Sequence, residues 1–248
     1  MSGNIGSGNT DNRYRRLAAA LMATTGLAGA LAGLAPLPAR ADAVIDGTTQ
    51  TFTTNKNYND FLFVGLDGTA TLNIQSGARV SGWFGTVGFN AGSKGTVNVT
   101  GAGSEWNDSN KTYIGYTGRG TLNVTNGGAV TGNTTSYIGY KADGVGTATV
   151  TGAGSSWTTY NLTVGERGTG TLTIADGGTV SAVSGSSTVT LGYTASGNGT
   201  INIGAAAGSA AKGAGTLDAK EFIFRNGAGT LNFNHTDTDY QFAAGMSG

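Results

Sequence analysis

The residues of this chain that could carry out acid–base or metal chemistry are few and widely spaced. Among its 248 residues are one histidine and no cysteine. That histidine, His235, stands beside Asp237 and Asp239, and a His-x-Asp-x-Asp run would hold a metal or act as a base only with groups supplied from elsewhere. We therefore predict a solvated turn at His235, with no metal site and no cofactor.

Carboxylates suited to cleaving a polysaccharide do not cluster either. A glycan-degrading enzyme built on stacked strands needs carboxylates on one face, to bind calcium or to act as acid and base. The acidic residues here stand singly at expected turns: Asp67, Asp108, Asp143, Glu166 and Asp176. We predict that the protein is not an enzyme, with a polysaccharide lyase or hydrolase as the alternative.

Aromatic side chains offer a different chemistry, because their large rigid faces can pack on a ligand such as a sugar ring. Trp106 and Trp157 end two equivalent Gly-Ala-Gly-Ser-x-Trp segments, and Tyr116 and Tyr140 each follow an Ile-Gly pair. These four residues are candidate ligand contacts. The competing interpretation, which we favour for the two tryptophans, packs them against aliphatic residues of neighbouring repeats.

The elements that must position these residues are short strands in a repeat of about 25 residues. A Thr that opens the strongest strand recurs at Thr71, Thr96, Thr121, Thr147, Thr171, Thr200 and Thr230. Each step contains runs with apolar/polar alternation, separated by Gly, Asn, Ser and Asp, and has no helical periodicity. This pattern predicts a solenoid of strands joined by tight corners.

Alternation assigns the two faces of the strongest strand, because successive side chains point to opposite sides. Two aliphatic ladders should point inward: Leu72, Val97, Leu122, Ala148, Leu172, Ile201 and Leu231, with Ile74, Val99, Val124, Val150, Ile174, Ile203 and Phe233. An outer polar ladder should lie between them: Asn73, Asn98, Asn123, Thr149, Thr173 and Asn202. The sequence therefore predicts a dry interior and an exterior of amides and hydroxyls.

Two further strands are expected in each repeat. One ends in a Val/Ile/Leu-Gly pair, and its Gly suits a corner. The other ends alternately in Val and Trp, while the Ala/Gly-rich residues 204–215 should bulge out as a loop. Together these features predict an all-β fold: a right-handed, single-stranded parallel β-helix of about seven coils with three short strands each.

Composition and charge exclude several classes of protein. Only 11% of the residues are charged, 45 are Gly and two are Pro, which does not fit a helical or α/β globule, collagen or a disordered chain. Removing the four Arg and one Asp of residues 1–41 from 14 basic and 14 acidic residues leaves 10 and 13, a net charge of −3. Such a surface does not attract phosphate backbones, so we expect no nucleic-acid partner.

The chain divides into four segments. Residues 1–41 have a basic start, an apolar run and a small-x-small end, and we interpret them as a cleavable signal peptide, with a retained membrane anchor as the alternative. Residues 42–60 are expected to be a polar lead-in and cap, and residues 61–234 the β-helix repeats. Residues 235–248 should start a further, truncated coil. We expect export through the inner membrane to the cell surface, the outer membrane or the medium.

The repeat also resembles a known family. Val99-Thr-Gly-Ala-Gly-Ser-Glu-Trp106 and Val150-Thr-Gly-Ala-Gly-Ser-Ser-Trp157, each followed by a Val/Ile-Gly strand, resemble the repeat of type V autotransporter passengers and of some exosortase-associated proteins. The resemblance implies a surface-displayed β-helix carried across the outer membrane by a C-terminal translocator barrel. No run of amphipathic barrel strands follows here, so we expect either a fragment of a longer autotransporter or a product without its translocator.

These observations favour a structural and adhesive role. We expect an exported cell-surface passenger segment that contacts a host or matrix glycan or protein, or a second copy of itself. The alternatives are a polysaccharide-acting β-helix enzyme and a passive spacer that carries another domain.

Overall fold

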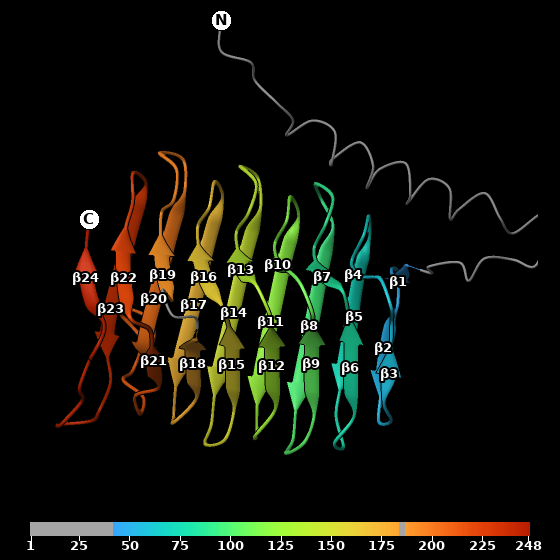
Figure 1. Ribbon diagram of the computed structural model, residues 1–248, viewed down its shortest axis with the longest axis horizontal. Coiled ribbons are helices and arrows are strands. Elements are labelled where there is room, and N and C mark those ends of the chain that lie inside the picture. The colour runs from blue at the N-terminus through green and yellow to red at the C-terminus, as the bar shows by residue number, and fades with distance from the viewer. Residues whose placement is uncertain (1–41, 184–186) are drawn as a thin grey trace, which may run out of the picture. The chain divides into compact units, whose positions relative to one another are not determined.

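The computed structural model describes residues 42–183 and 187–248, and the regular structure in this part of the chain is β throughout (Figure 1). The predicted signal peptide, residues 1–41, lies outside the described residues. Three parallel sheets stack their strands along one axis, and the chain visits them in turn, so that each circuit forms one coil of a solenoid. The predicted β-helix is therefore confirmed, with about eight coils in place of seven.

In each of the three sheets, the strands lie side by side in the order in which the chain reaches them. Sheet A contains β1 (Ala43–Ile45), β4 (Phe61–Val64), β7 (Phe84–Val87), β10 (Thr112–Ile114), β13 (Thr135–Ile138), β16 (Asn161–Val164), β19 (Thr188–Leu191), β22 (Glu221–Phe224) and β24 (Gly245–Ser247). Sheet B contains β2 (Thr49–Phe52), β5 (Thr69–Ile74), β8 (Lys94–Thr100), β11 (Arg119–Thr125), β14 (Val145–Thr151), β17 (Thr169–Ala175), β20 (Asn198–Gly204) and β23 (Ala228–Asn234). Sheet C contains β3 (Lys56–Asn57), β6 (Arg79–Gly82), β9 (Glu105–Asp108), β12 (Ala129–Gly132), β15 (Ser156–Thr159), β18 (Thr179–Ala182) and β21 (Thr216–Asp218).

The interior is built from the two aliphatic ladders expected on sheet B. Leu122 pairs with Val97 on one side and with Ala148 on the other, and the same register continues through the sheet. Leu72, Leu122, Leu172 and Ile201 all have no exposed surface and belong to one core cluster. Stacked aliphatic side chains and rung-to-rung hydrogen bonds therefore stabilise each coil through its neighbours.

The last rung departs from the predicted pattern. Phe233 was expected to point into the dry column, yet it is 46% exposed, and Leu231 is only partly buried. Both residues belong to β23, which is the edge strand of sheet B in the described chain. The prediction of a buried Phe233 was wrong because side chains on an edge rung lack the following coil that would cover them.

The N-terminal segment, for which a polar lead-in and cap was predicted, contains three strands. Residues 43–57 form β1, β2 and β3, which pair with β4, β5 and β6 and make a complete first coil. In this first coil the exposed Gln50 pairs with Leu72 of the next coil. The first coil is therefore polar at a position where later coils are aliphatic. In residues 235–248, β24 pairs with β22 and extends sheet A.

Glycine makes the tight corner between sheets A and B possible. Gly115 has a φ of +75°, and a Cβ there would lie 2.3 Å from the carbonyl oxygen of Val145 on the next coil. Any side chain would therefore meet backbone as well as adopt an unfavourable conformation. Residues 205–215 form the predicted loop between β20 and β21. No α-helix able to span a lipid bilayer occurs in residues 42–183 or 187–248.

Candidate binding surface

Tyr116 and Tyr140 lie together on the outside of the solenoid. Their ring centroids are 5.1 Å apart, and Phe89 stacks on the other side of Tyr116 at 4.8 Å. Each of these residues follows a corner glycine, and the amide of each bonds to the coil before it, which keeps the three rings in register. One aromatic column therefore follows the corner after sheet A.

A second aromatic column lies beside the first. Tyr113 and Tyr137 are direct neighbours in sheet A, and their rings stack at 5.3 Å with an angle of 10°. Edge-to-face contacts join the columns, with Tyr113 at 5.2 Å from Tyr116 and Tyr137 at 4.9 Å from Tyr140. The four tyrosines therefore form one rigid block outside the aliphatic core, in which Tyr113 and Tyr116 are buried and Tyr137 and Tyr140 are partly exposed.

Lysines lie over this tyrosine block. The Nζ of Lys141 is 5.2 Å from the ring centroid of Tyr140 and 5.6 Å from that of Tyr116, and the Nζ of Lys111 is 5.8 Å from that of Tyr137. A cation at this distance is attracted to the ring face. The rings therefore hold the two ammonium groups at defined places on the surface.

Two groups beside these lysines have altered acidity. Burial and, to a smaller extent, the nearby charge of Glu166 together raise the pKa of Tyr137 to about 12. Burial also raises the pKa of the Glu166 carboxyl, while Arg167 and Lys111 oppose that increase. This surface is thus partly shielded from water and carries both positively and negatively charged groups.

Trp106 and Trp157 are not part of this surface. Both indoles are fully buried in the core cluster, and each pairs with Val130 across sheet C. Their suggested role as ligand contacts is therefore excluded by their position, and the packing interpretation is correct. Room for Trp106 comes from Gly85, where a Cβ would lie 2.3 Å from the indole ring.

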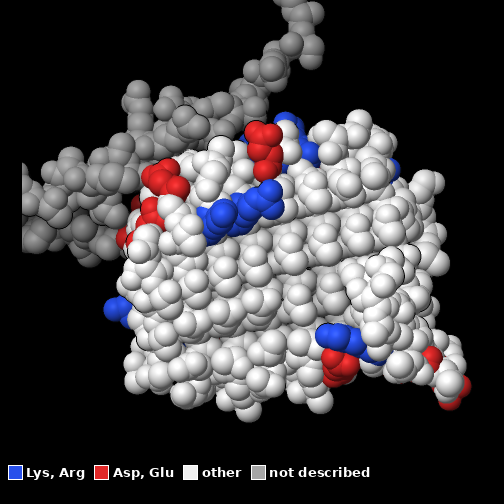
Figure 2. Space-filling view, turned by 180° about the vertical axis from the view of Figure 1, so that it is seen from behind, with Lys and Arg blue, Asp and Glu red and all other residues white. Residues whose placement is uncertain are grey.

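The outer polar ladder of sheet B carries side-chain hydrogen bonds in two sets. The amide of Asn123 donates to the side-chain oxygen of Asn98 at 2.8 Å, and Asn98 donates to Asn73 at 2.8 Å. Asn202 similarly donates to Thr173 at 3.1 Å, and Thr149 occupies the position between the two sets. In the view of Figure 2 most of the visible face has no charged side chain, and the charged groups gather towards its edges.

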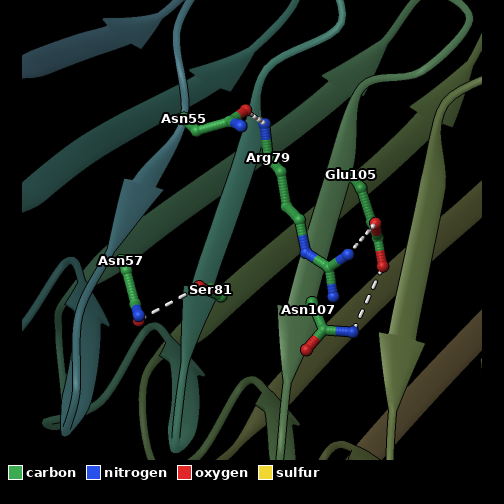
Figure 3. A network of polar contacts seen from close by, with 6 residues as sticks. All are labelled: Asn55, Asn57, Arg79, Ser81, Glu105 and Asn107. Atoms are coloured by element: carbon green, nitrogen blue, oxygen red, sulfur yellow. Dashed lines mark hydrogen bonds and ion pairs between the residues drawn. The ribbon is translucent and has the colours of Figure 1, made fainter.

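Sheet C carries a smaller polar network on its outer face (Figure 3). Arg79 forms an ion pair with Glu105 at 3.3 Å, and Asn107 donates to the same carboxylate at 3.1 Å. The backbone amide of Arg79 donates to Asn55 at 2.8 Å. The guanidinium side is half exposed, so this pair stabilises the fold only weakly.

The acidic residues and the histidine do not form a metal centre in the described part of the chain. No group of three or more His, Cys, Asp or Glu side chains is arranged to hold an ion there. Asp237 accepts a bond from the backbone of Ala214, and His235 packs against Tyr240. Asp108 is buried inside the solenoid, where its carboxylate accepts a hydrogen bond from Thr112 and is closed off from solvent.

A shallow pocket at the corner between sheets A and B holds residues that the sequence reasoning missed. It has a volume of about 280 Å³, and Lys94, Arg119, Thr117 and Asp143 contribute to its lining. The signal that could have revealed it is the repeat itself, because Lys94 and Arg119 both directly precede the Gly-Thr pair of their strands. The candidate surface therefore comprises this pocket and the adjoining tyrosine block.

Comparison with known proteins leaves the geometry as the guide to function. No protein-family model, no curated protein and no solved structure matches this chain.

Proposed function

We propose that the protein is an exported β-solenoid with a structural and adhesive role at the cell surface, of the kind found in autotransporter passengers. The observation that carries the proposal is the surface formed by the tyrosine block and the cations beside it. Rigid rings and fixed charges on the outside of a regular scaffold suit binding of an external polymer or protein. The resemblance of the repeat to passenger repeats supports export and display.

The fold favours adhesion over catalysis. Hydrolysis of a glycan needs two carboxyl groups about 5 to 10 Å apart with a sugar between them. Asp143 and Glu166 belong to the corners of neighbouring coils, but each has cations close by, and the other acidic residues of the described chain lie elsewhere. A polysaccharide enzyme on this scaffold is therefore the weaker proposal.

A display experiment tests the adhesive role. Cells that display the protein should attach to glycan-coated, matrix-coated or cell-covered surfaces, or to one another, and cells that lack residues 42–248 should not. If deletion leaves attachment and aggregation unchanged, the adhesive role is wrong. A passive spacer predicts a different result, because unrelated coils of the same length would then restore every function of the displayed protein.

A further inference from the structure

Four cations follow one another along the corner between sheets A and B. Lys94 and Arg119 begin neighbouring strands and pair directly with each other across the sheet. Lys141 and Arg167 occupy the same corner on the next two coils, since Arg167 donates from its backbone to Tyr140 and Lys141 to Tyr116. Four successive coils therefore each bring one cation to this corner, in two pairs. Lys94 and Arg119 are neighbours at the strand spacing of about 4.8 Å. Lys141 and Arg167 form the second pair, earlier in the corner, because the positions in register with Arg119 on their coils are Val145 and Thr169.

The protein neutralises these cations only in part, through Asp143 at the pocket and Glu166 beside Arg167. Like charges directly opposite one another destabilise a sheet. None of the four cations forms an ion pair with a carboxylate within residues 42–183 and 187–248, where the recorded pair joins Arg79 to Glu105. A fold that gains nothing from adjacent like charges is expected to keep them for a ligand.

The pocket gives the row a shape that a polymer can enter. Lys94 and Arg119 line it together with the backbone of Gly92 and Gly118. A Cβ on Gly118 would lie 2.3 Å from the hydroxyl of Ser93, so the pocket floor has no room for a larger residue. In the view of Figure 2, basic and acidic side chains lie together near one edge of a mostly uncharged face.

We propose that this corner binds a linear polysaccharide of uronic acids, lying parallel to the solenoid axis with its carboxylates on Lys94, Arg119, Lys141 and Arg167. The cations recur once per coil, and a uronic acid chain likewise presents one carboxylate per sugar. An Arg guanidinium binds a carboxylate through two parallel hydrogen bonds. The proposal deepens the adhesive role and rests on it.

The acidic residues of the corner favour a glycan over a nucleic acid. Asp143 lines the same pocket, and Glu166 precedes Arg167. Both polymers are anionic, so charge does not separate them. Carboxylates accept hydrogen bonds from the free hydroxyls that every sugar of a polyuronate carries, whereas the sugars within a DNA strand have no free hydroxyl.

The test measures binding of the full chain to polygalacturonate, to its methyl ester and to single-stranded DNA. The acid form should bind, with an affinity that falls as salt rises, and the uncharged ester should bind at least about tenfold more weakly. The double variant Lys94→Gln/Arg119→Gln should lose about tenfold or more in affinity for the acid form. The control Lys56→Gln/Lys212→Gln removes the same charge from exposed sites elsewhere and should bind normally.

Each other outcome contradicts the proposal. Equal binding of acid and ester, equal loss in both double variants, tighter binding of DNA, or no binding of polygalacturonate would overturn it. Thermal unfolding of each variant shows whether it is folded, which is expected because Lys94 and Arg119 are exposed. If polygalacturonate does not bind but displayed protein still mediates attachment, this inference fails and the adhesive role stands.

Discussion

The hydroxyl of Thr112 donates a hydrogen bond to the carboxylate of Asp108 at 3.0 Å inside the solenoid. Asp108 ends β9 and is 1% exposed, and its neighbours across sheet C are Gly82 and Gly132. A Cβ on Gly82 would lie 3.5 Å from one oxygen of this carboxylate and a Cβ on Gly85 2.1 Å from the other, so these two glycines leave space for the carboxyl group. Burial raises the pKa of Asp108 to about 7, although the hydrogen bond from Thr112 opposes the increase.

This buried carboxyl should make the protein less stable as pH rises. Below the unfolded pKa of 3.8, Asp108 is protonated in both states. Between that pKa and about 7 the folded state keeps the proton while the unfolded state releases it, so stability falls with pH, by about 4 kcal/mol in total. Denaturant unfolding from pH 4 to 8 should detect the loss, and Asp108→Asn should abolish most of it. Parallel curves for the two proteins would contradict this prediction.

The polar ladder of sheet B should contribute to stability through its hydrogen bonds. Asn98 donates to Asn73 and accepts from Asn123, so Asn98→Ala removes two bonds. We expect a loss of about 1–2 kcal/mol in the free energy of unfolding, because each net hydrogen bond contributes about 1 kcal/mol. Thr149→Ala is the control in the same row and should cost less. Equal losses would mean that strand propensity, and not the amide ladder, sets the stability.

The corner glycines allow conformational strain to be separated from steric conflict. Gly92 and Gly115 have φ values of +85° and +75°, but a Cβ on Gly92 has no atom within 4 Å. Gly92→Ala should therefore cost about 1–2 kcal/mol through its backbone conformation alone. Gly115→Ala should cost at least about 3 kcal/mol, since its Cβ also meets the backbone of Val145. Chemical denaturation of both variants gives the difference, and similar losses would refute the steric explanation.

Much of the fold could be predicted because the repeat specifies one register many times. The alternation around Leu122 assigns its face, and the recurrence of the same pattern at Val97 and Leu172 places those residues in one column. Errors occurred where the repeat stops being periodic. Residues 43–57 have Gln50 where the next coil has Leu72, yet they form strands that pair with that coil, and Phe233 keeps the pattern on an edge strand of the described chain.

The candidate site was less predictable, because it depends on whether each side chain at a corner points into the solenoid or out of it. The shared Gly-Ala-Gly-Ser-x-Trp segment drew attention to Trp106 and Trp157, but strand alternation turns both indoles inward. Tyr116 and Tyr140 come directly after corner glycines, where alternation gives no direction. Lys94 and Arg119 are 25 residues apart in the sequence, and the register of sheet B brings them together.

The pairing of Lys94 with Arg119 also predicts that the proposed binding row reduces stability. Thr69 and Thr169 occupy the same position on other coils. Replacing one cation by Thr should relieve the repulsion and raise the free energy of unfolding by up to about 1 kcal/mol at low salt. The gain should shrink as added salt screens the two charges.

Denaturant unfolding of Lys94→Thr and Arg119→Thr at low and high salt measures this effect. Thr169→Lys is the matched control, because its neighbours Val145 and Asn198 are uncharged and a single added cation there should change stability little. The two stabilised variants should at the same time bind polygalacturonate more weakly. If they are no more stable than the unmodified protein at low salt, the two cations do not repel each other, and the argument that the fold keeps them for a ligand loses its basis.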